Sequence, residues 1–370
     1  MAKKILSGVF IVVAMVIFGS NSAWSWFGQK KEAIKIGAIL PLSGASSQVG
    51  EAQRNGMMLA IDEINSWGGI NARKIELIIK DSKTDKQEGK KAFEKIEAAH
   101  HPLIYISSLS TVSLELVPPA DENKVVVVGL AATAPELTKQ SKWVFRYFSL
   151  AENQVPPMLS ILEELQVKKL GMIYINDEYG RSFFELARKG FERTGGIIRG
   201  EPYDGKKADF KEQIAKLKDT SAIYVVVRSD HLKDIFKQLK EEGFIGVIVA
   251  AGNVSVPSIK DLAEANGIYL VSPIIYHPNF LYAKKVGKRY EAKYGKPFDH
   301  YAANGYDIIK LLAGILEDEE IERNNMKRLL EEGFIYHGIF GEIILNPGER
   351  NINFPLYPAQ IIDGRIKYTQ

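Results

Sequence analysis

The chain has 370 residues, of which 46% are hydrophobic and 25% are charged, which is an ordinary globular composition. Its length favours two or three domains that each bury a core. A net charge of +3 indicates neither a nucleic-acid partner nor a broad membrane-binding face. The chain has no cysteine, which excludes thiol catalysis, disulfides and thiolate metal sites.

The first residues have the pattern of a secretion signal. Lys3 and Lys4 precede an apolar run over 5–18, and small or polar residues follow. This order is typical of a signal peptide, and the apolar run is shorter than the roughly 20 residues of a membrane span. We therefore expect residues 1–23 to be removed after Ala23 and the mature chain to be periplasmic. An uncleaved membrane anchor is the alternative.

Strand-like and helix-like runs alternate from Glu32 onward. Gly68 and Gly69 end the first helical run, as glycines at helix C-termini do. The alternation predicts parallel sheets with helices on both faces. In chain order, the first series comprises a strand at 33–40, a helix at 55–67, a strand at 74–80, a helix at 86–99, and strands at 103–106 and 125–128.

A second series of the same kind follows residue 151, so two tandem doubly wound α/β units fit the pattern. It comprises strands at 169–175, 196–201, 222–227 and 245–250 and helices at 179–194, 208–217 and 231–242. The last third is mainly helical and then turns to short strands. Its helices are expected at 281–294, 301–316 and 325–332, and its strands at 340–345, 355–362 and 365–368.

Three stretches of sequence resemble one known family. They are residues 36–70, 125–138 (VVVVGLAATAPELT) and 175–196 (INDEYGRSFFELARKGFERTGG). Together they are similar to the periplasmic branched-chain amino-acid (Leu/Ile/Val) binding proteins, the type I substrate-binding components of ABC importers. The resemblance extends over about 34–368.

This resemblance implies the type I periplasmic binding protein fold, in which two Rossmann-like lobes are joined by a three-segment hinge and the ligand lies between them. Lobe 1 would comprise 33–149 plus 278–336, and lobe 2 would comprise 152–272 plus 340–370. The hinge segments would fall near 149–151, 271–275 and 336–338. A ligand between the lobes, beyond the carboxyl ends of the strands, agrees with the general rule for open α/β sheets.

The resemblance also implies where a ligand would bind. Ser110, Ala131 and Thr133 match the family positions that hold the ligand's α-carboxylate. Each lies after a strand and just before a helix start, where N–H groups and hydroxyls would face an anion; the two hydroxyl residues could instead be simple helix caps. Tyr179 matches a residue that offers an aromatic face and a hydroxyl from lobe 2. Val49, in the first strand–helix loop, is a weaker candidate.

Two positions depart from the family. The acid that pairs with an amino-acid ligand's ammonium falls on Gly252, beside Asn253, and a buried ammonium without a carboxylate partner is costly. Either another acid compensates, with Asp230 the nearest, or the ligand lacks an α-amino group. Arg228 stands where the family has small or aromatic residues, and its guanidinium suits a carboxylate, unless it pairs with Asp230 or Glu178.

The sequence thus predicts a monomeric solute-binding protein that delivers a small carboxylate, without an α-amino group, to an ABC permease in the inner membrane. Two alternatives keep the same lobes: a true branched-chain amino-acid binder, and a binding protein that serves a chemoreceptor or sensor kinase. An enzyme is disfavoured because the phosphate-loop, nucleophile-elbow and metal-site patterns are missing from the sequence. We expect no metal, cofactor or nucleic acid.

Overall fold

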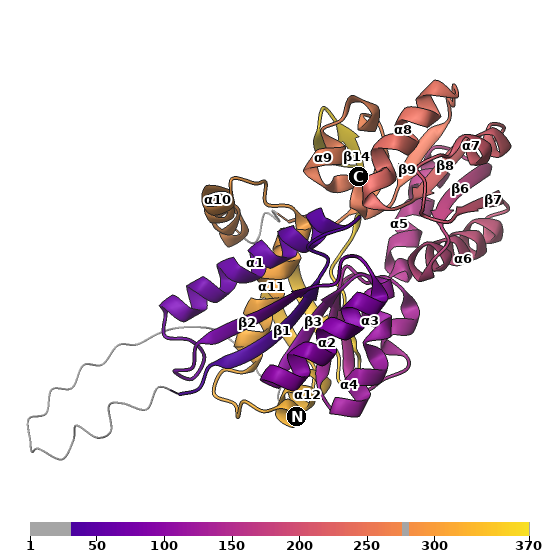
Figure 1. The fold of residues 1–370 in the computed structure, drawn as a ribbon. Helices are drawn as coiled ribbons and strands as arrows, with labels where there is room; N and C mark the ends of the chain where they lie inside the picture. The colour runs from indigo at the N-terminus through magenta and orange to yellow at the C-terminus, as the bar shows by residue number, and fades with distance from the viewer. Residues whose placement is uncertain (1–30, 276–280, 370) are drawn as a thin grey trace, which may run out of the picture.

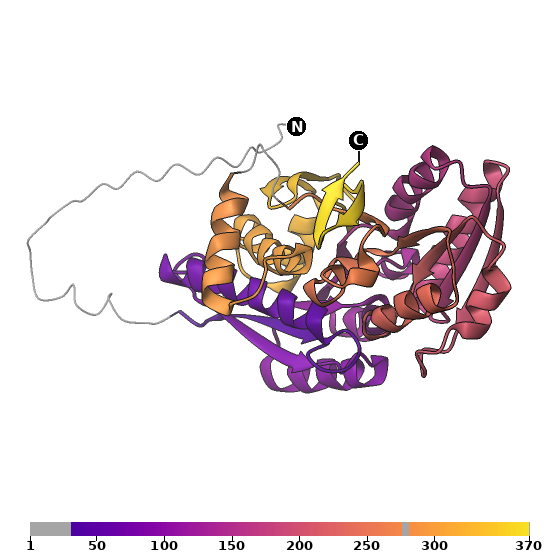
Figure 2. The same cartoon turned by 90° about the horizontal axis from the view of Figure 1, so that it is seen from above.

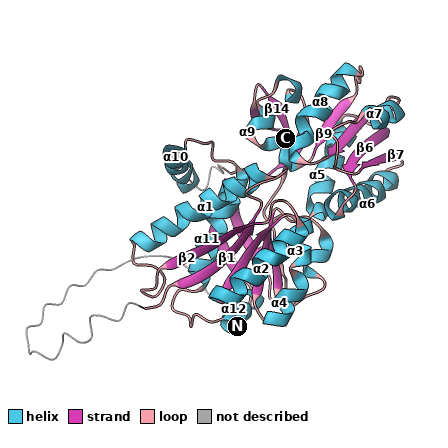
Figure 3. Ribbon diagram, viewed as in Figure 1, coloured by secondary structure: helices cyan, strands magenta, loops and turns pink. Residues whose placement is uncertain are grey.

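The computed structural model describes residues 31–275 and 281–369, which form two lobes that lie side by side (Figures 1 and 2). Each lobe has a central sheet with helices on its faces (Figure 3). The predicted secretion signal lies outside the described residues. Within the described ranges, no helix is long and apolar enough to cross a membrane.

The sheet of lobe 1 is parallel throughout, in the order β13-β5-β4-β3-β1-β2. Its strands are β1 (Ile34–Leu40), β2 (Ile75–Asp81), β3 (Ile104–Ser108), β4 (Val126–Leu130), β5 (Val144–Tyr147) and β13 (Asn351–Ile352). Helices α1 (Ser47–Ser66), α11 (His300–Ile315) and α12 (Arg323–Glu331) cover one face, and α2 (Lys86–His100), α3 (Ser110–Glu115) and α4 (Val117–Asn123) cover the other. Because both faces are covered, the central strands are apolar without alternation.

Helices α1 and α11 pack against each other although they are far apart in the sequence. A Cβ atom at Gly56 would lie 2.0 Å from the carbonyl oxygen of Ala302, and one at Gly305 would lie 2.1 Å from that of Gln53. Only glycine permits so close an approach of the two backbones. This contact fixes the C-terminal helical segment on lobe 1.

The sheet of lobe 2 has the order β15-β14-β10-β9-β8-β6-β7, with β14 and β15 antiparallel to their neighbours. Its strands are β6 (Lys169–Ile175), β7 (Ile197–Tyr203), β8 (Ala222–Val226), β9 (Val247–Ala250), β10 (Tyr269–Ser272), β14 (Tyr357–Ile362) and β15 (Arg365–Tyr368). Helices α5 (Ala151–Glu164) and α6 (Glu178–Arg193) pack on one face, and α7 (Lys211–Leu217) and α8 (Leu232–Glu241) on the other.

The α/β fold class with two Rossmann-like lobes is confirmed. The strand predicted at 169–175 has the predicted bounds, and α1 begins at Ser47 rather than at residue 55. The elements that were not predicted include β5 and α5. The first is only four residues long, and the second contains Pro156 and Pro157, which argue against a helix from sequence.

The third passage between the lobes lies later than predicted. Residues near 336–338 do not cross, because β11 (Phe334–Gly338) turns back onto β12 (Gly341–Leu345) and β13 then pairs with β5 of lobe 1. Asp307 of α11 holds this segment: its carboxylate accepts hydrogen bonds from the Tyr336 hydroxyl at 2.5 Å and from the Ile339 N–H at 2.8 Å. Residues 340–352, predicted in lobe 2, therefore lie with lobe 1, and the chain enters the second sheet only at β14.

Candidate functional site

The two sheets place their loops around one cavity. The central orders β2-β1-β3-β4 and β7-β6-β8-β9 both reverse direction beside the first strand of the lobe. Ligands of open α/β sheets bind at such reversals, beyond the carboxyl ends of the strands. A cavity of about 270 Å³ lies there, lined by loops of both lobes. That volume is at the small end for ligand sites.

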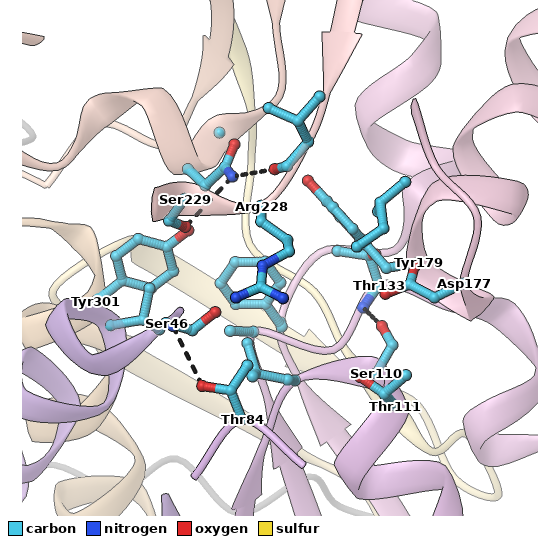
Figure 4. A pocket seen from close by; sticks show the side chains of 18 of the residues that line it. Ser46, Thr84, Ser110, Thr111, Thr133, Asp177, Tyr179, Arg228, Ser229 and Tyr301 are labelled. Carbon is cyan, nitrogen blue, oxygen red and sulfur yellow. Dashed lines mark hydrogen bonds between the residues drawn. The ribbon is translucent and has the colours of Figure 1, made fainter. Parts of the chain in front are cut away.

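The lobe 1 side of the cavity is formed by Ser110 and the 131–134 loop (Ala131 to Ala134). The Ser110 hydroxyl oxygen accepts a hydrogen bond from the backbone N–H of Thr133 at 3.0 Å (Figure 4) and a second one from the backbone N–H of Ala134 at 3.2 Å. The hydroxyl hydrogen of Ser110 therefore remains available for a donor bond to a ligand. Ala131 has a φ of 46°, in the left-handed region, so the chain turns sharply as it leaves β4.

Thr133 has an unsatisfied hydroxyl. The residue is 3% exposed, and its Oγ1 has no hydrogen-bond partner among the described residues. A buried hydroxyl without a partner costs free energy, so its presence at the cavity calls for an explanation. An anionic ligand group that accepts from both Ser110 and Thr133 would supply one.

The lobe 2 side is formed by Asp177 and Tyr179 at the start of α6 (Figure 4). Asp177 is the N-cap and accepts a hydrogen bond from the Gly180 N–H at 3.0 Å. Burial raises the pKa of Asp177, and the Gly180 N–H acts in the opposite direction. Burial also raises the pKa of the Tyr179 phenol, which therefore stays protonated and can donate a hydrogen bond.

Arg228 lines the cavity, but its guanidinium is already engaged. Its Nε and Nη2 donate to the two carboxylate oxygens of Asp230 at 3.0 and 2.9 Å, and Nη1 donates to the Gly205 carbonyl at 3.0 Å. Asp230 raises the pKa of Arg228 but does not itself line the cavity. The structure therefore contains the ion pair between Arg228 and Asp230 that the sequence left as the alternative to ligand binding. Asp230 does not lie where it could meet a ligand's ammonium.

Gly252 and Asn253 lie at the cavity as well. A Cβ at Gly252 would approach only the Val271 carbonyl, at 3.6 Å, so this position has room for a side chain that the sequence does not supply. The Asn253 side chain is turned to the backbone instead, and its Nδ2 donates to the Val227 carbonyl at 2.9 Å. Val49 completes the predicted set, all of which except Asp230 lines the cavity.

Several lining residues were not among the predicted set. Asp177 follows a predicted strand directly, so its position alone could have indicated it. Phe148 and Tyr301 could not be inferred, because Phe148 follows a strand that was not predicted and Tyr301 comes from α11. Their rings stack with an interplanar angle of 3° and form an apolar wall. The further lining residues not predicted include Ser46, Thr84 and Gln154.

Two α/β lobes with a partly polar cavity between them define a two-lobed ligand-binding protein. A family model described as periplasmic binding protein matches residues 33–365, and the chain belongs to this family. It is a family of binding proteins, not of enzymes. Among the residues that the structure describes, no group of three or more His, Asp or Glu side chains is placed to hold a metal ion.

Characterised relatives are similar over much of the chain. The "Leucine-, isoleucine-, valine-, threonine-, and alanine-binding protein" of Pseudomonas aeruginosa is 27% identical over 247 residues, which span 64% of this chain and 64% of that protein. A branched-chain amino acid transporter substrate-binding protein of Streptococcus pneumoniae, solved with isoleucine, has a TM-score of 0.82 at 23% identity, covering 90% of this chain and 98% of that one. An ABC-transporter solute-binding protein of Rhodopseudomonas palustris, solved with 3,4-dihydroxybenzoic acid, also has a TM-score of 0.82, at 20% identity, covering 91% and 95%. At these identities the two solved structures establish the fold alone.

Proposed function

We propose that this protein captures a small carboxylate-bearing solute between its lobes, outside the cytoplasmic membrane, and delivers it to an ABC permease. The three proteins described above are all named as binding proteins. The first is named for the amino acids it binds, the second was solved with isoleucine, and the third was solved with 3,4-dihydroxybenzoic acid. All three kinds of printed ligand contain a carboxylate. That common group agrees with the chemistry of the lobe 1 loops.

The observation that carries the proposal is the unpartnered Thr133 hydroxyl beside Ser110. Two hydroxyl donors that converge at the end of a parallel sheet fit an anionic acceptor, and hydrogen bonds to charged groups are the stronger kind. The Tyr179 phenol adds a donor from the opposite lobe. A ligand that bridges these groups would favour closure of the lobes, because it binds the closed form better than the open one.

We further propose that the carboxylate lacks an α-amino group. Support comes from Gly252, which leaves the ammonium position without an acid although the backbone has room for one. Arg228 no longer supports this part of the proposal, since Asp230 neutralises it. An ammonium held in the cavity without a carboxylate would be strongly disfavoured.

Leucine and 4-methylpentanoate test this directly, because they differ only in the α-ammonium. We expect 4-methylpentanoate to raise the melting temperature of the purified protein more than leucine does. A ligand at 100 times its Kd adds about 2.7 kcal/mol to the free energy of unfolding, which a thermal-shift measurement resolves easily. If neither compound, nor benzoate, nor 3,4-dihydroxybenzoate stabilises the folded protein, the proposal of a small carboxylate ligand is wrong.

The matched variant is Gly252→Glu. It restores an acid at the position where the sequence lacks one, and the surrounding backbone leaves space for the new Cβ. We expect the variant to bind leucine more tightly than the wild type does, and 4-methylpentanoate less tightly. Unchanged preference in a folded variant would show that residue 252 does not face the ligand's α-carbon.

One observation favours the second candidate, a true amino-acid binder. The Asp177 carboxylate lines the cavity and could meet an ammonium in place of an acid at residue 252. Asp177→Asn separates the two candidates, because asparagine is also a good N-cap and preserves the start of α6. If the variant loses leucine binding while 4-methylpentanoate binding is kept, Asp177 is the ammonium partner and the ligand is an amino acid.

A further inference from the structure

Arg146 is a fully buried arginine in lobe 1, outside the cavity. It lies in β5, where it stands in register with Gly129 of β4, and its side chain is 0% exposed. Its backbone N–H donates to the Arg350 carbonyl at 2.8 Å. Arginine is almost never fully buried unless its guanidinium is paired, so its surroundings need an account.

The guanidinium of Arg146 has few partners. Its Nη2 donates to the Ala134 carbonyl, whereas Nε and Nη1 are buried and have no hydrogen-bond partner among the described residues. Within the described part of the chain no carboxylate accepts a hydrogen bond from it, although Glu136 and Glu152 act on its charge over a longer range. Burial lowers the pKa of Arg146 to about 10, which still leaves it charged at neutral pH.

Among the described residues, the one group that the Arg146 guanidinium bonds is the Ala134 carbonyl, which belongs to the 131–134 loop. The Ala134 N–H, on the same residue as the carbonyl that Arg146 holds, donates to the Ser110 hydroxyl. Thr133, with its unsatisfied hydroxyl, precedes Ala134 in the chain. The guanidinium thus bonds one residue of the 131–134 loop, while Ala131 and Thr133 of the same loop line the cavity. The interior of the lobe has a low dielectric constant and therefore screens the positive charge little.

We propose that Arg146 is a specificity-determining positioning residue: its buried charge, which no carboxylate pairs directly, makes the 131–134 loop select an anionic group of the ligand without touching that ligand. The inference rests on the proposed function, because it concerns the same carboxylate. A buried cation without a directly paired counter-ion destabilises the unliganded lobe, and an anion that arrives at the loop offsets this cost. Ser110 and Thr133 would supply hydrogen bonds, and Arg146 would supply the charge.

The test compares carboxylates with their amides in Arg146→Met and Arg146→Lys. The probe pairs are 4-methylpentanoate with 4-methylpentanamide, and 3,4-dihydroxybenzoate with 3,4-dihydroxybenzamide, measured by calorimetric titration. We expect the wild-type preference for the acid over the amide to fall about tenfold in Arg146→Met, as loss of a nearby unit charge predicts. Arg146→Lys, which keeps the charge, should retain most of the preference.

Arg54→Met is the matched control. It removes one positive charge from lobe 1 at a partly exposed site on α1 that does not line the cavity, so it changes the net charge equally but should leave the acid-to-amide ratio unchanged. Urea denaturation of the unliganded variants gives a readout that needs no ligand. Arg146→Met should be more stable than the wild type, because it removes an unpaired buried charge, whereas a residue with a structural role would lose stability.

The outcomes separate the two proposals. If the wild type binds neither acid, the carboxylate function fails and the role of Arg146 fails with it. If the wild type prefers the acids and Arg146→Met keeps that preference in full, the proposed function stands and the inference about Arg146 is overturned. Marked destabilisation of unliganded Arg146→Met together with an unchanged ratio would assign the arginine to the fold alone.

Discussion

Thr133→Val should stabilise the unliganded protein and weaken ligand binding at the same time. Valine has nearly the shape of threonine but no hydroxyl, so the substitution removes the buried oxygen that has no partner. An unsatisfied buried hydroxyl costs about 1–3 kcal/mol, so the free energy of unfolding should rise by about 1 kcal/mol or more. A lost hydrogen bond to a carboxylate, at about 1.5–3 kcal/mol, corresponds to binding that is weaker by about 10-fold to 150-fold.

Two measurements on the same protein check this prediction: urea denaturation without ligand, and calorimetric titration with 4-methylpentanoate or 3,4-dihydroxybenzoate. Thr138→Val is the control, because Thr138 is equally buried but its hydroxyl donates to Asn351 Oδ1 at 2.9 Å. That variant should lose stability and keep its affinity. If Thr133→Val is less stable than the wild type and binds as tightly, then the hydroxyl serves the fold and the reasoning is refuted.

Three further predictions concern the fold and its dependence on pH. Ser110→Ala removes the acceptor of two buried backbone N–H groups, so both stability and affinity for these carboxylates should fall, which urea denaturation and titration would detect. Gly56→Ala places a Cβ 2.0 Å from the Ala302 carbonyl, so thermal unfolding should occur at a markedly lower temperature; an unchanged melting temperature would contradict the close packing of α1 and α11. Burial lowers the pKa of His300 from 6.5 to about 3. Between these two pH values the unfolded chain binds a proton that the folded chain does not. Stability that is present above pH 6.5 is therefore lost as the pH falls, by about 2 kcal/mol at pH 5. His300→Gln should flatten that part of the profile of unfolding free energy against pH.

The fold could be predicted from the sequence because hydrophobic periodicity and the glycines that end helices are local signals. β6 and α2, with its Asp85 cap, are marked by their own residues. The third passage between the lobes could not be placed in this way. It depends on Asp307, whose carboxylate accepts hydrogen bonds from Tyr336 and Ile339. Contacts between residues that are distant in the chain produce no periodic pattern in the sequence.

The residues of the candidate site could likewise be predicted only in part. Ser110, Thr133 and Tyr179 were expected from the family resemblance, and each follows a strand, so the topology of the sheet brings it to the cavity. Arg228 was predicted to face an anionic ligand, and it does line the cavity, but its charge is taken by Asp230 two residues further along the chain. Position along a strand predicts which residues reach a cavity. It does not predict which of their hydrogen-bonding groups remain free once the side chains have found partners.

Among the buried side-chain atoms of the described residues that have no hydrogen-bond partner, three belong to residues that lie in the 131–134 loop or bond to it. Thr133 Oγ1 and two nitrogens of Arg146 are unsatisfied, and both residues are tied to the 131–134 loop, one within it and one behind it. The same loop is joined to the first passage between the lobes, since the Ala151 N–H donates to the Thr133 carbonyl at 3.0 Å. Unsatisfied donors lower stability, and a fold selected for stability alone would replace them with apolar groups of the same shape. Donors that are already fixed in place lose little entropy when an acceptor binds. If the proposed carboxylate binds at this loop, the stability given up in the empty lobe would therefore be recovered as affinity, and the Ala151 bond would transmit part of it to the hinge.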